Sequence, residues 1–335
     1  MHLDIPYKFR LIILFAISFV ATMLIFKPIL EIAKKKNIVD NPDARKLQKD
    51  PIPVMGGIAV FFGIAVGLCF FKTMIVYTAL FPVLGAMTVM LYIGCIDDIL
   101  ALKPNVRFLL EIVASLVLIY GMRRCIVNFQ GMWGIDTISL AVALPLSVIT
   151  FLGIVNAINM IDGVDGLSSA FCILILGSLG IVCFLAHEYS FAVLSAVSIG
   201  SLLPFFLHNV FGLKTKMFIG DGGTMMMGAA ITSMVFVILR NNLTFPEFPE
   251  LDFSRIAFVI AVLSVPIADT LRVMIARIAR HKSPFAPDKT HMHHILIQLQ
   301  FSYISITIIE IAVDLLTIGL FFLVWRLGAS IELQL

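Results

Sequence analysis

The chain has 335 residues, of which 60% are hydrophobic and only 13% are charged, and its formal net charge is +3. About 25% of the residues in a typical soluble domain are charged, so this composition excludes an ordinary soluble protein. The small net charge also gives no reason to expect a nucleic-acid partner.

Apolar segments with the length of a membrane-spanning helix recur along the whole chain. Each has about 17–22 residues, which is enough to cross a bilayer. They lie near 10–30, 54–71, 74–96, 107–122, 138–158, 167–186, 190–211, 223–240, 255–276 and 304–326. A bilayer admits helices or closed barrels, and none of these segments alternates as barrel strands do. We predict an all-α, polytopic membrane protein of about ten transmembrane helices, with residues 1–335 forming one domain.

The first apolar segment is too long for a signal peptide and lacks a small-residue cleavage site, so we expect it to be a span. The five cysteines form no CxxC pair and lie in or beside apolar segments, as expected for buried, inert thiols.

Lysine and arginine residues are distributed unevenly between the two sets of loops. The connectors after the first, third, fifth, seventh and ninth segments carry 15 of them, and the other loops and the termini carry 8. Since basic residues concentrate in cytoplasmic loops, we expect the first set to face the cytoplasm and both termini to face outward. Every polar cluster described below lies on the predicted cytoplasmic side.

The first two clusters are "DNPDARKLQKDPIPVMGG" (40–57), which includes Lys49, and "GCIDDILALKPNVRFLLE" (94–111). Asp97 and Asp98 end the third segment, where the helix dipole disfavours negative charge. A positive partner should offset this effect: a metal ion, another bound cation or a side chain such as Arg107. The alternative is a solvated helix end followed by a turn.

The stretch "NAINMIDGVDGL" (156–167) places Asn156, Asn159, Asp162 and Asp165 three residues apart. This spacing puts side chains near one face of a helix, so the last three are predicted to point into one pocket. The intervening glycines permit close backbone approach. The alternative is an ordinary Asp-Gly turn.

Asp221 of "IGDGGT" precedes an apolar helix predicted to begin near Thr224. Helix N-termini attract phosphate, and an aspartate there can hold a divalent ion that bridges to phosphate oxygens. The alternative is that Asp221 caps the helix.

The "HMHH" stretch supplies His291, His293 and His294. Zinc is disfavoured because no cysteine is near and the other clusters offer the hard oxygen ligands that suit Mg²⁺ or Mn²⁺. With nearby basic residues such as Arg277, the histidines are predicted to bind an anion. The alternative is a basic loop that contacts anionic lipid. Asp269, inside the ninth segment, is expected to support this group.

Carboxylates for a hard cation and bases for phosphates, all beside lipid, suit phosphoryl transfer from a soluble donor to a lipid acceptor. Five motifs in family order then carry a resemblance: "DNPDARKLQKDPIPVMGG", "DD" at 97–98, "NAINMIDGVDGL", "IGDGGT" and "PFAPDKTHMHHIL". The chain resembles the polyprenyl-phosphate N-acetylhexosamine-1-phosphate transferases, over about residues 40–300. It is most similar to the bacterial undecaprenyl-phosphate GlcNAc-1-phosphate transferases. The first motif departs from the family's Arg-Lys-x-His, because Gln48 replaces the histidine and cannot transfer a proton.

The resemblance implies that undecaprenyl phosphate attacks the β-phosphorus of a UDP-N-acetylhexosamine, with Mg²⁺ or Mn²⁺ as cofactor and UMP as leaving group. It also implies roles for single residues. Asp221 would hold the metal, with Asn159 as a second ligand, and Asp97 and Asp98 would act on the lipid phosphate. Asp162 and Asp165 would shape the nucleotide-sugar site. The substrate-binding residues would be Lys49, Arg107, Asn156, Asn159, Arg277, His291, His293 and His294.

The product would be a lipid-diphosphate-linked sugar, made in the bacterial cytoplasmic membrane, that initiates a cell-envelope polysaccharide such as the O-antigen. A homodimer is compatible with this function. One alternative is the related phospho-N-acetylmuramoyl-pentapeptide transferase. The other is an ion-coupled secondary transporter, which should place its polar residues near the bilayer midplane and contain an internal repeat.

Overall fold

The computed structural model describes residues 6–40, 50–71, 74–240, 243–283 and 290–335. In this part of the chain the regular secondary structure is almost entirely helical, as predicted, with one short antiparallel pair of strands that joins Val39 to Pro53 and Asp40 to Ile52. The elements are α1 (Tyr7–Lys35), β1 (Val39–Asp40), β2 (Ile52–Pro53), α2 (Gly56–Cys69), α3 (Met74–Leu100), α4 (Pro104–Met122), η1 (Met132–Gly134), α5 (Leu140–Met160), α6 (Leu167–Leu185), α7 (Tyr189–Phe211), α8 (Gly220–Ile238), α9 (Arg255–Val262), α10 (Ser264–Ala279), α11 (Met292–Gln298), α12 (Tyr303–Arg326) and η2 (Ile331–Gln334).

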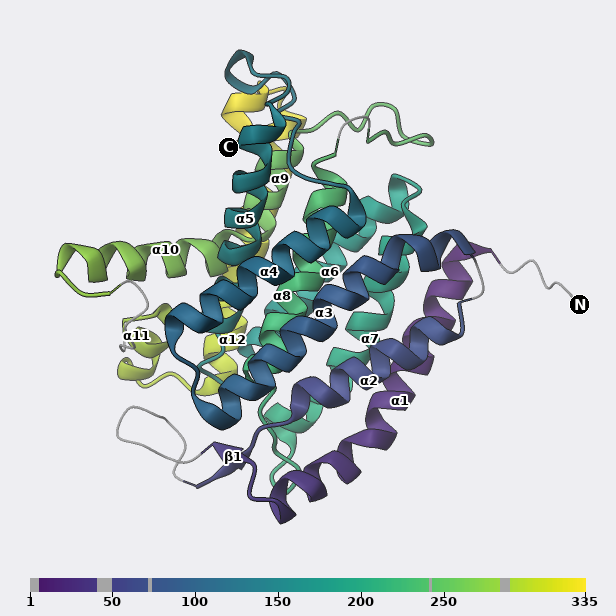
Figure 1. Cartoon of the computed structure of the whole chain (residues 1–335). Coiled ribbons are helices and arrows are strands. Elements are labelled where there is room, and N and C mark those ends of the chain that lie inside the picture. The colour runs from purple at the N-terminus through teal and green to yellow at the C-terminus, as the bar shows by residue number, and fades with distance from the viewer. Residues whose placement is uncertain (1–5, 41–49, 72–73, 241–242, 284–289) are drawn as a thin grey trace, which may run out of the picture.

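Eight helices of the described chain are long and apolar enough to cross a membrane: α1, α3, α4, α5, α6, α7, α8 and α12. Two of the ten predicted spans differ from expectation. The second, α2, has only 14 residues, or about 21 Å of helix, because Val54 pairs with Phe218 instead of starting the helix. The ninth is broken into α9 and α10, which meet at 73°. Figure 1 shows α10 projecting sideways from the bundle.

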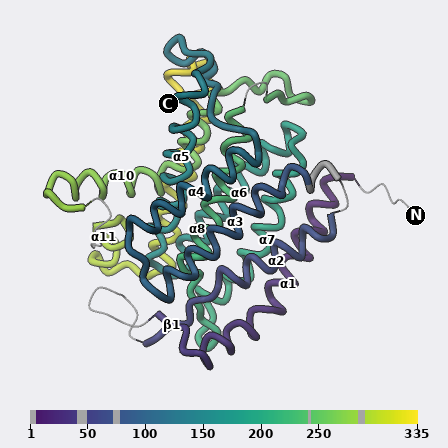
Figure 2. The backbone as a smooth tube through the Cα atoms, viewed as in Figure 1, coloured from purple at the N-terminus to yellow at the C-terminus, as the bar shows by residue number. Residues whose placement is uncertain are grey.

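The centre of the bundle is α8, which packs against α2, α3, α5 and α6 (Figures 1 and 2). In the most apolar stretch of α8, 94% of the residues are buried inside the protein. Glycines allow the closest contacts, because a Cβ on Gly94 of α3 would lie 2.3 Å from the backbone nitrogen of Gly222. Likewise, a Cβ on Gly57 of α2 would lie 2.5 Å from Gly223. Small residues at these positions bring the helix backbones together, and this proximity positions the polar residues at the start of α8.

Backbone hydrogen bonds join the segment before α2 to the segment before α8. Phe218 donates to the carbonyl of Pro53 at 2.8 Å, Gly56 donates to Phe218 at 2.9 Å, and Gly57 donates to Ile219 at 2.8 Å. The described end of the first predicted motif therefore lies beside the "IGDGGT" motif.

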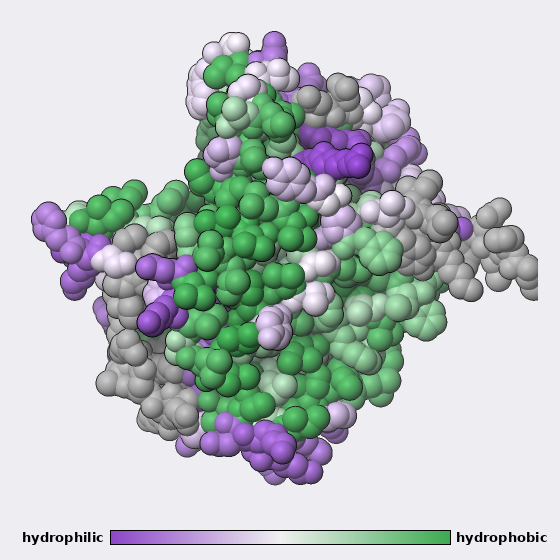
Figure 3. All heavy atoms as spheres, viewed as in Figure 1, coloured by the Kyte–Doolittle hydropathy of each residue, from purple (hydrophilic) through white to green (hydrophobic). Residues whose placement is uncertain are grey.

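The surface has the pattern of a membrane protein. Figure 3 shows a broad hydrophobic area across the middle of the molecule, with hydrophilic side chains gathered at its lower and upper ends. Such a broad apolar surface is suited to contact lipid.

Candidate active site

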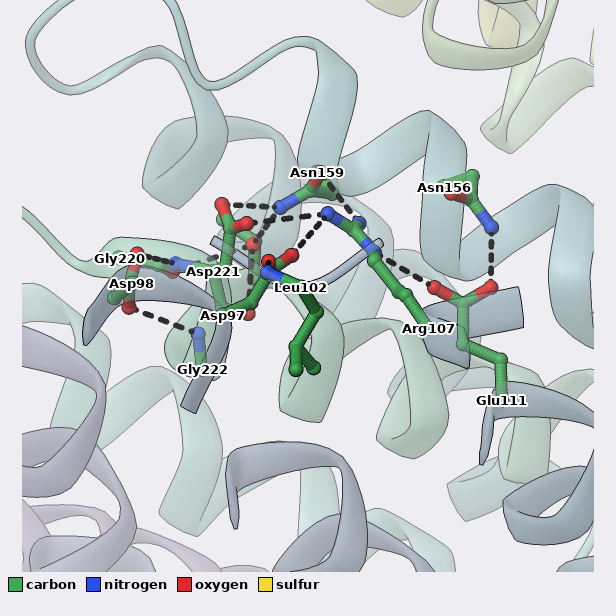
Figure 4. Close-up of polar contacts among 11 residues, drawn as sticks. Asp97, Asp98, Leu102, Arg107, Glu111, Asn156, Asn159, Gly220, Asp221 and Gly222 are labelled. Atoms are coloured by element: carbon green, nitrogen blue, oxygen red, sulfur yellow. Dashed lines mark hydrogen bonds and ion pairs between the residues drawn. The ribbon is translucent and has the colours of Figure 1, made fainter. Parts of the chain in front are cut away.

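Two acidic clusters that are distant in the sequence meet where the end of α3 faces the start of α8 (Figure 4). Asp97 and Asp98 lie in the last turn of α3, and Asp221 lies in the first turn of α8. The Asp98 carboxylate accepts hydrogen bonds from the backbone N–H groups of Asp221 at 3.1 Å and Gly222 at 3.5 Å. The positive end of the α8 dipole therefore offsets the unfavourable position of these acids at the C-terminus of α3.

The structure rejects the alternative that Asp221 caps its own helix. Helix α8 begins about one turn before the predicted Thr224, and its N-cap residue, Ile219, makes no side-chain cap. Asp98 of α3 satisfies the first N–H groups instead, and Gly220 allows this with a φ of +74°. The Asp221 side chain is thereby free to face the other carboxylates.

Arg107 of α4 connects these groups (Figure 4), and it is one of the positive partners that the sequence offered for the α3 carboxylates: it pairs with Asp97. Its Nη1 donates to Asp97 Oδ2 at 2.9 Å and to Asp221 Oδ2 at 3.1 Å, and its Nη2 donates to Asn159 Oδ1 at 2.8 Å. Asn159 also donates to Asp221 Oδ1 at 2.9 Å. We call Asp97, Asp98, Arg107, Asn159 and Asp221 the carboxylate cluster.

Glu111 holds Arg107 in place, and the sequence analysis missed it. Its carboxylate accepts from Arg107 Nε at 3.0 Å and from Asn156 Nδ2 at 2.7 Å, and its side chain is 1% exposed. Asn156, predicted to bind substrate, supports Glu111 in the structure. The signal was present in the sequence: an ionisable residue inside an apolar segment, four positions after an arginine.

The stretch 156–167 does not present its polar residues on one helical face, so that prediction was wrong. Helix α5 ends at Met160, and the chain then turns before α6 begins at Leu167. Asn159 reaches the carboxylate cluster from the last turn of α5, while Asp162 accepts a hydrogen bond from Ser168. Asp165 forms an ion pair with Lys216.

Asp162 lies in the turn between the two spans, where it reaches solvent but is surrounded by protein. This desolvation, with smaller contributions from Asp221 and Asp165, raises the pKa of its carboxyl group to about 7, although Ser168 lowers it. The Asp162 carboxyl group thus lies within electrostatic range of Asp221 of the carboxylate cluster.

Two of the three histidines contact α10 and the 161–166 turn. His291 Nδ1 lies 2.7 Å from Asp269 Oδ2, and the backbone of Met292 donates to the same carboxylate at 3.0 Å. These contacts agree with the prediction that Asp269 supports the histidines. His293 packs on Gly163 so closely that a Cβ there would lie 2.2 Å from its Nε2. The glycine thus makes room for a histidine of this chain.

His293 cannot supply positive charge to the predicted anion site. It is 2% exposed, and burial, with smaller contributions from His294 and His291, lowers its pKa to about 3. His293 is therefore neutral at physiological pH and can act only as a hydrogen-bonding group. Positive charge near it comes from Arg277, whose Nη2 lies 3.5 Å from His291 Nε2.

His294 and Lys49 are the remaining residues that were predicted to bind substrate. His294 lies in α11 with its ring 4.4 Å from that of His293. Lys49, like Gln48 of the same motif, lies outside the described residues.

The carboxylate cluster fits a hard divalent cation in the type of its donors. Within the described chain, no group of three or more His, Cys, Asp and Glu side chains is arranged as a metal cage. Mg²⁺ usually takes only one or two protein carboxylates and completes its shell with water and substrate phosphates. The oxygen atoms of Asp97, Asp221 and Asn159 that would suit this ion accept hydrogen bonds from Arg107.

The fold and the site together define a polytopic membrane protein with an acidic, arginine-bridged site at one end of its helical bundle. The family model described as glycosyl transferase family 4 matches residues 80–239, which include all of the carboxylate cluster.

Curated relatives extend this similarity over most of the chain. A probable undecaprenyl-phosphate N-acetylglucosaminyl 1-phosphate transferase of Bacillus subtilis is 30% identical over 302 residues, covering 88% of this chain and 79% of the relative. A decaprenyl-phosphate N-acetylglucosaminephosphotransferase of Mycobacterium tuberculosis is 33% identical, covering 84% and 74%. The undecaprenyl-phosphate alpha-N-acetylglucosaminyl 1-phosphate transferase of Escherichia coli is 25% identical, covering 81% and 72%. The chain belongs to glycosyl transferase family 4, among the polyprenyl-phosphate N-acetylhexosamine-1-phosphate transferases.

Proposed function

We propose that this protein transfers N-acetylglucosamine 1-phosphate from UDP-N-acetylglucosamine to a polyprenyl phosphate, most naturally undecaprenyl phosphate. An oxygen of the lipid phosphate attacks the β-phosphorus of the donor, the bond from that phosphorus to the bridging oxygen breaks, and UMP leaves. The names of the relatives support the acceptor and the transferred sugar phosphate.

One observation carries this proposal: the carboxylate cluster lies at the end of a bundle of membrane-length helices and is bridged by one arginine. Such a site can receive a water-soluble nucleotide and a lipid head group together. A transporter would instead gather its polar residues near the bilayer midplane.

The main chemical obstacle is the repulsion between two phosphate-bearing substrates. A phosphate monoester is mostly dianionic at pH 7, so strong base catalysis is not needed. Arg107 provides a fixed positive charge. A bound Mg²⁺ held by Asp221 and Asn159, with Mn²⁺ as a substitute, would supply the remaining neutralisation. Asp162, Asp165 and the histidines of α11 border the same end and would contact the nucleotide sugar.

Mass spectrometry of the lipid product tests the proposal. Purified protein is incubated with polyprenyl phosphate and, in turn, UDP-N-acetylglucosamine, UDP-N-acetylgalactosamine and UDP-N-acetylmuramoyl-pentapeptide. We expect a lipid-diphosphate N-acetylglucosamine and stoichiometric UMP from the first donor. A muramoyl-pentapeptide product would assign the related peptidoglycan reaction, and release of UDP rather than UMP would contradict phosphosugar transfer.

We further propose that the site faces the cytoplasm, because basic residues concentrate in the loops at that end. In a cysteine-free variant, Arg280→Cys at the end of α10 should react with a membrane-impermeant maleimide only after permeabilisation. Glu250→Cys, in an exposed loop before α9, should react in intact cells. The opposite labelling pattern would reverse the proposed orientation.

A further inference from the structure

The apolar segment 255–279 is broken where α9 ends at Val262 and α10 begins at Ser264. The two helices meet at 73°. Pro266 in the first turn of α10 explains the break, because it lacks an N–H donor and its ring excludes the carbonyl four residues earlier from a straight helix. The N–H groups at the start of α10 therefore need acceptors from elsewhere.

Asp314 of α12 supplies such an acceptor. Its side chain is fully buried, and its Oδ1 accepts from Ser264 Oγ at 2.8 Å and from the backbone of Val265 at 3.1 Å. The N-cap residue of α10, Leu263, provides no side-chain cap of its own. A carboxylate of another helix thus does what an N-cap side chain normally does, and its charge is favourable at the N-terminus of a helix.

The direction of α10 determines where the histidines lie. Asp269, five residues after Ser264 on α10, contacts His291 and the backbone of Met292. Arg272, also on α10, donates to Asp269 Oδ1 and to the carbonyl of Thr290. A change in the angle between α9 and α10 would therefore move the segment that begins α11.

The same face of α12 also approaches two residues that surround the candidate site, Asp165 and Asp269. Thr307 Oγ1 donates to the carbonyl of Asp165 at 3.4 Å. Glu310, 2% exposed, lies within electrostatic range of Asp269. Ionisable residues within membrane helices are costly and usually functional, and α12 carries two of them toward α10 and the site.

We propose that Asp314 is a positioning residue: by capping α10 from α12, it fixes the break at Ser264 and thereby the place of His291 beside the nucleotide-sugar site. The role in turnover depends on the proposed function, whereas the role in placing α10 does not. Asp314 itself contacts neither the carboxylate cluster nor the histidines, so it acts through α10.

The experiment compares Asp314→Leu, which removes the acceptor, with Asp314→Asn, which retains one oxygen for Ser264 and Val265. Nitroxide labels on the exposed residues Ile149 of α5 and Ile275 of α10 report their separation by pulsed electron paramagnetic resonance in lipid nanodiscs. We expect the Leu variant to shift or broaden the distance distribution and the Asn variant to keep it. Ser264→Ala, which removes one of the two hydrogen bonds to Asp314, should give a smaller change in the same direction. If Asp314→Leu does not fold, Ser264→Ala provides the test in its place.

The KM values of the two substrates then distinguish a positioning role of Asp314 from a general loss of structure. If the whole free energy of a helix cap, about one tenfold factor, is lost from binding of the nucleotide sugar, Asp314→Leu should raise the KM for the UDP-sugar about tenfold. The KM for polyprenyl phosphate should stay unchanged. Asp314→Asn should restore the wild-type value to within about threefold. Unchanged distances in the Leu and Ala variants would overturn the proposal, and so would equal losses in the Leu and Asn variants. If the wild-type protein does not turn over these substrates, the distances still test the placement of α10.

Discussion

Replacing Asp221 with Asn is expected to lower kcat by about 10²–10³-fold, as does the removal of one group that stabilises transition-state charge in other enzymes. Asp221 accepts from Arg107 through one oxygen and from Asn159 through the other. Asparagine keeps the shape but replaces one acceptor with an NH₂ group that faces a donor. If Asp221 holds Mg²⁺, the variant should also lose the binding of Mn²⁺ measured by electron paramagnetic resonance without substrate.

The matched control is Asp136→Asn, the same chemical change at an exposed site outside the described helices. It should leave kcat and the melting temperature unchanged. EDTA should abolish transfer by the wild-type protein, and Mg²⁺ or Mn²⁺ should restore it. Near-normal turnover and Mn²⁺ binding in Asp221→Asn would remove this residue from the proposed metal site.

Replacing Arg107 with Gln should reduce both turnover and stability. Its guanidinium contacts Asp97, Asn159, Asp221 and Glu111. In the Gln variant, the buried Glu111 carboxylate still accepts a hydrogen bond from Asn156 but loses its positively charged partner. Leaving a buried group without its partner costs about 1–3 kcal/mol, and we expect a loss of this size in the free energy of unfolding. Turnover should fall by about 10²-fold or more, because a positive charge beside the phosphates is lost.

A double variant separates the two effects. In Arg107→Gln with Glu111→Gln, the buried carboxylate is replaced by an amide that can still bond Asn156, so stability should largely return while turnover stays low. Arg107→Lys keeps the charge, but a single ammonium nitrogen cannot reach all four partners of the planar guanidinium, and its turnover should be intermediate. Recovery of turnover in the double variant would mean that Arg107 serves only to neutralise Glu111.

The sequence predicted well those features that depend on local patterns. Apolar segments of fixed length indicated ten helices, and all ten regions are helical in the structure. The adjacent acids Asp97 and Asp98 required a positive partner, and the structure confirmed Arg107 as the partner of Asp97. The ordered motifs indicated the transferase family, which the comparisons confirmed.

Errors arose where local spacing was extended to a contact. The three-residue spacing of Asn159, Asp162 and Asp165 suggested one helical face, but the helix ends at Met160, before the two acids. The "HMHH" stretch was predicted to bind an anion, and its sequence did not show that burial keeps His293 neutral. Neither the end of a helix nor the burial of a side chain follows from the identity of neighbouring residues.

By itself, the sequence determined the membrane class, the number of apolar segments and the family, because hydropathy and motif order are properties of the chain alone. Tertiary structure decided the partners: Asp98 caps α8, Glu111 holds Arg107, and Asp314 caps α10. These contacts join residues on different helices and depend on how closely the backbones pack. In the bundle, glycines such as Gly94 and Gly222 set that distance, and their effect is visible only when the facing helix is known.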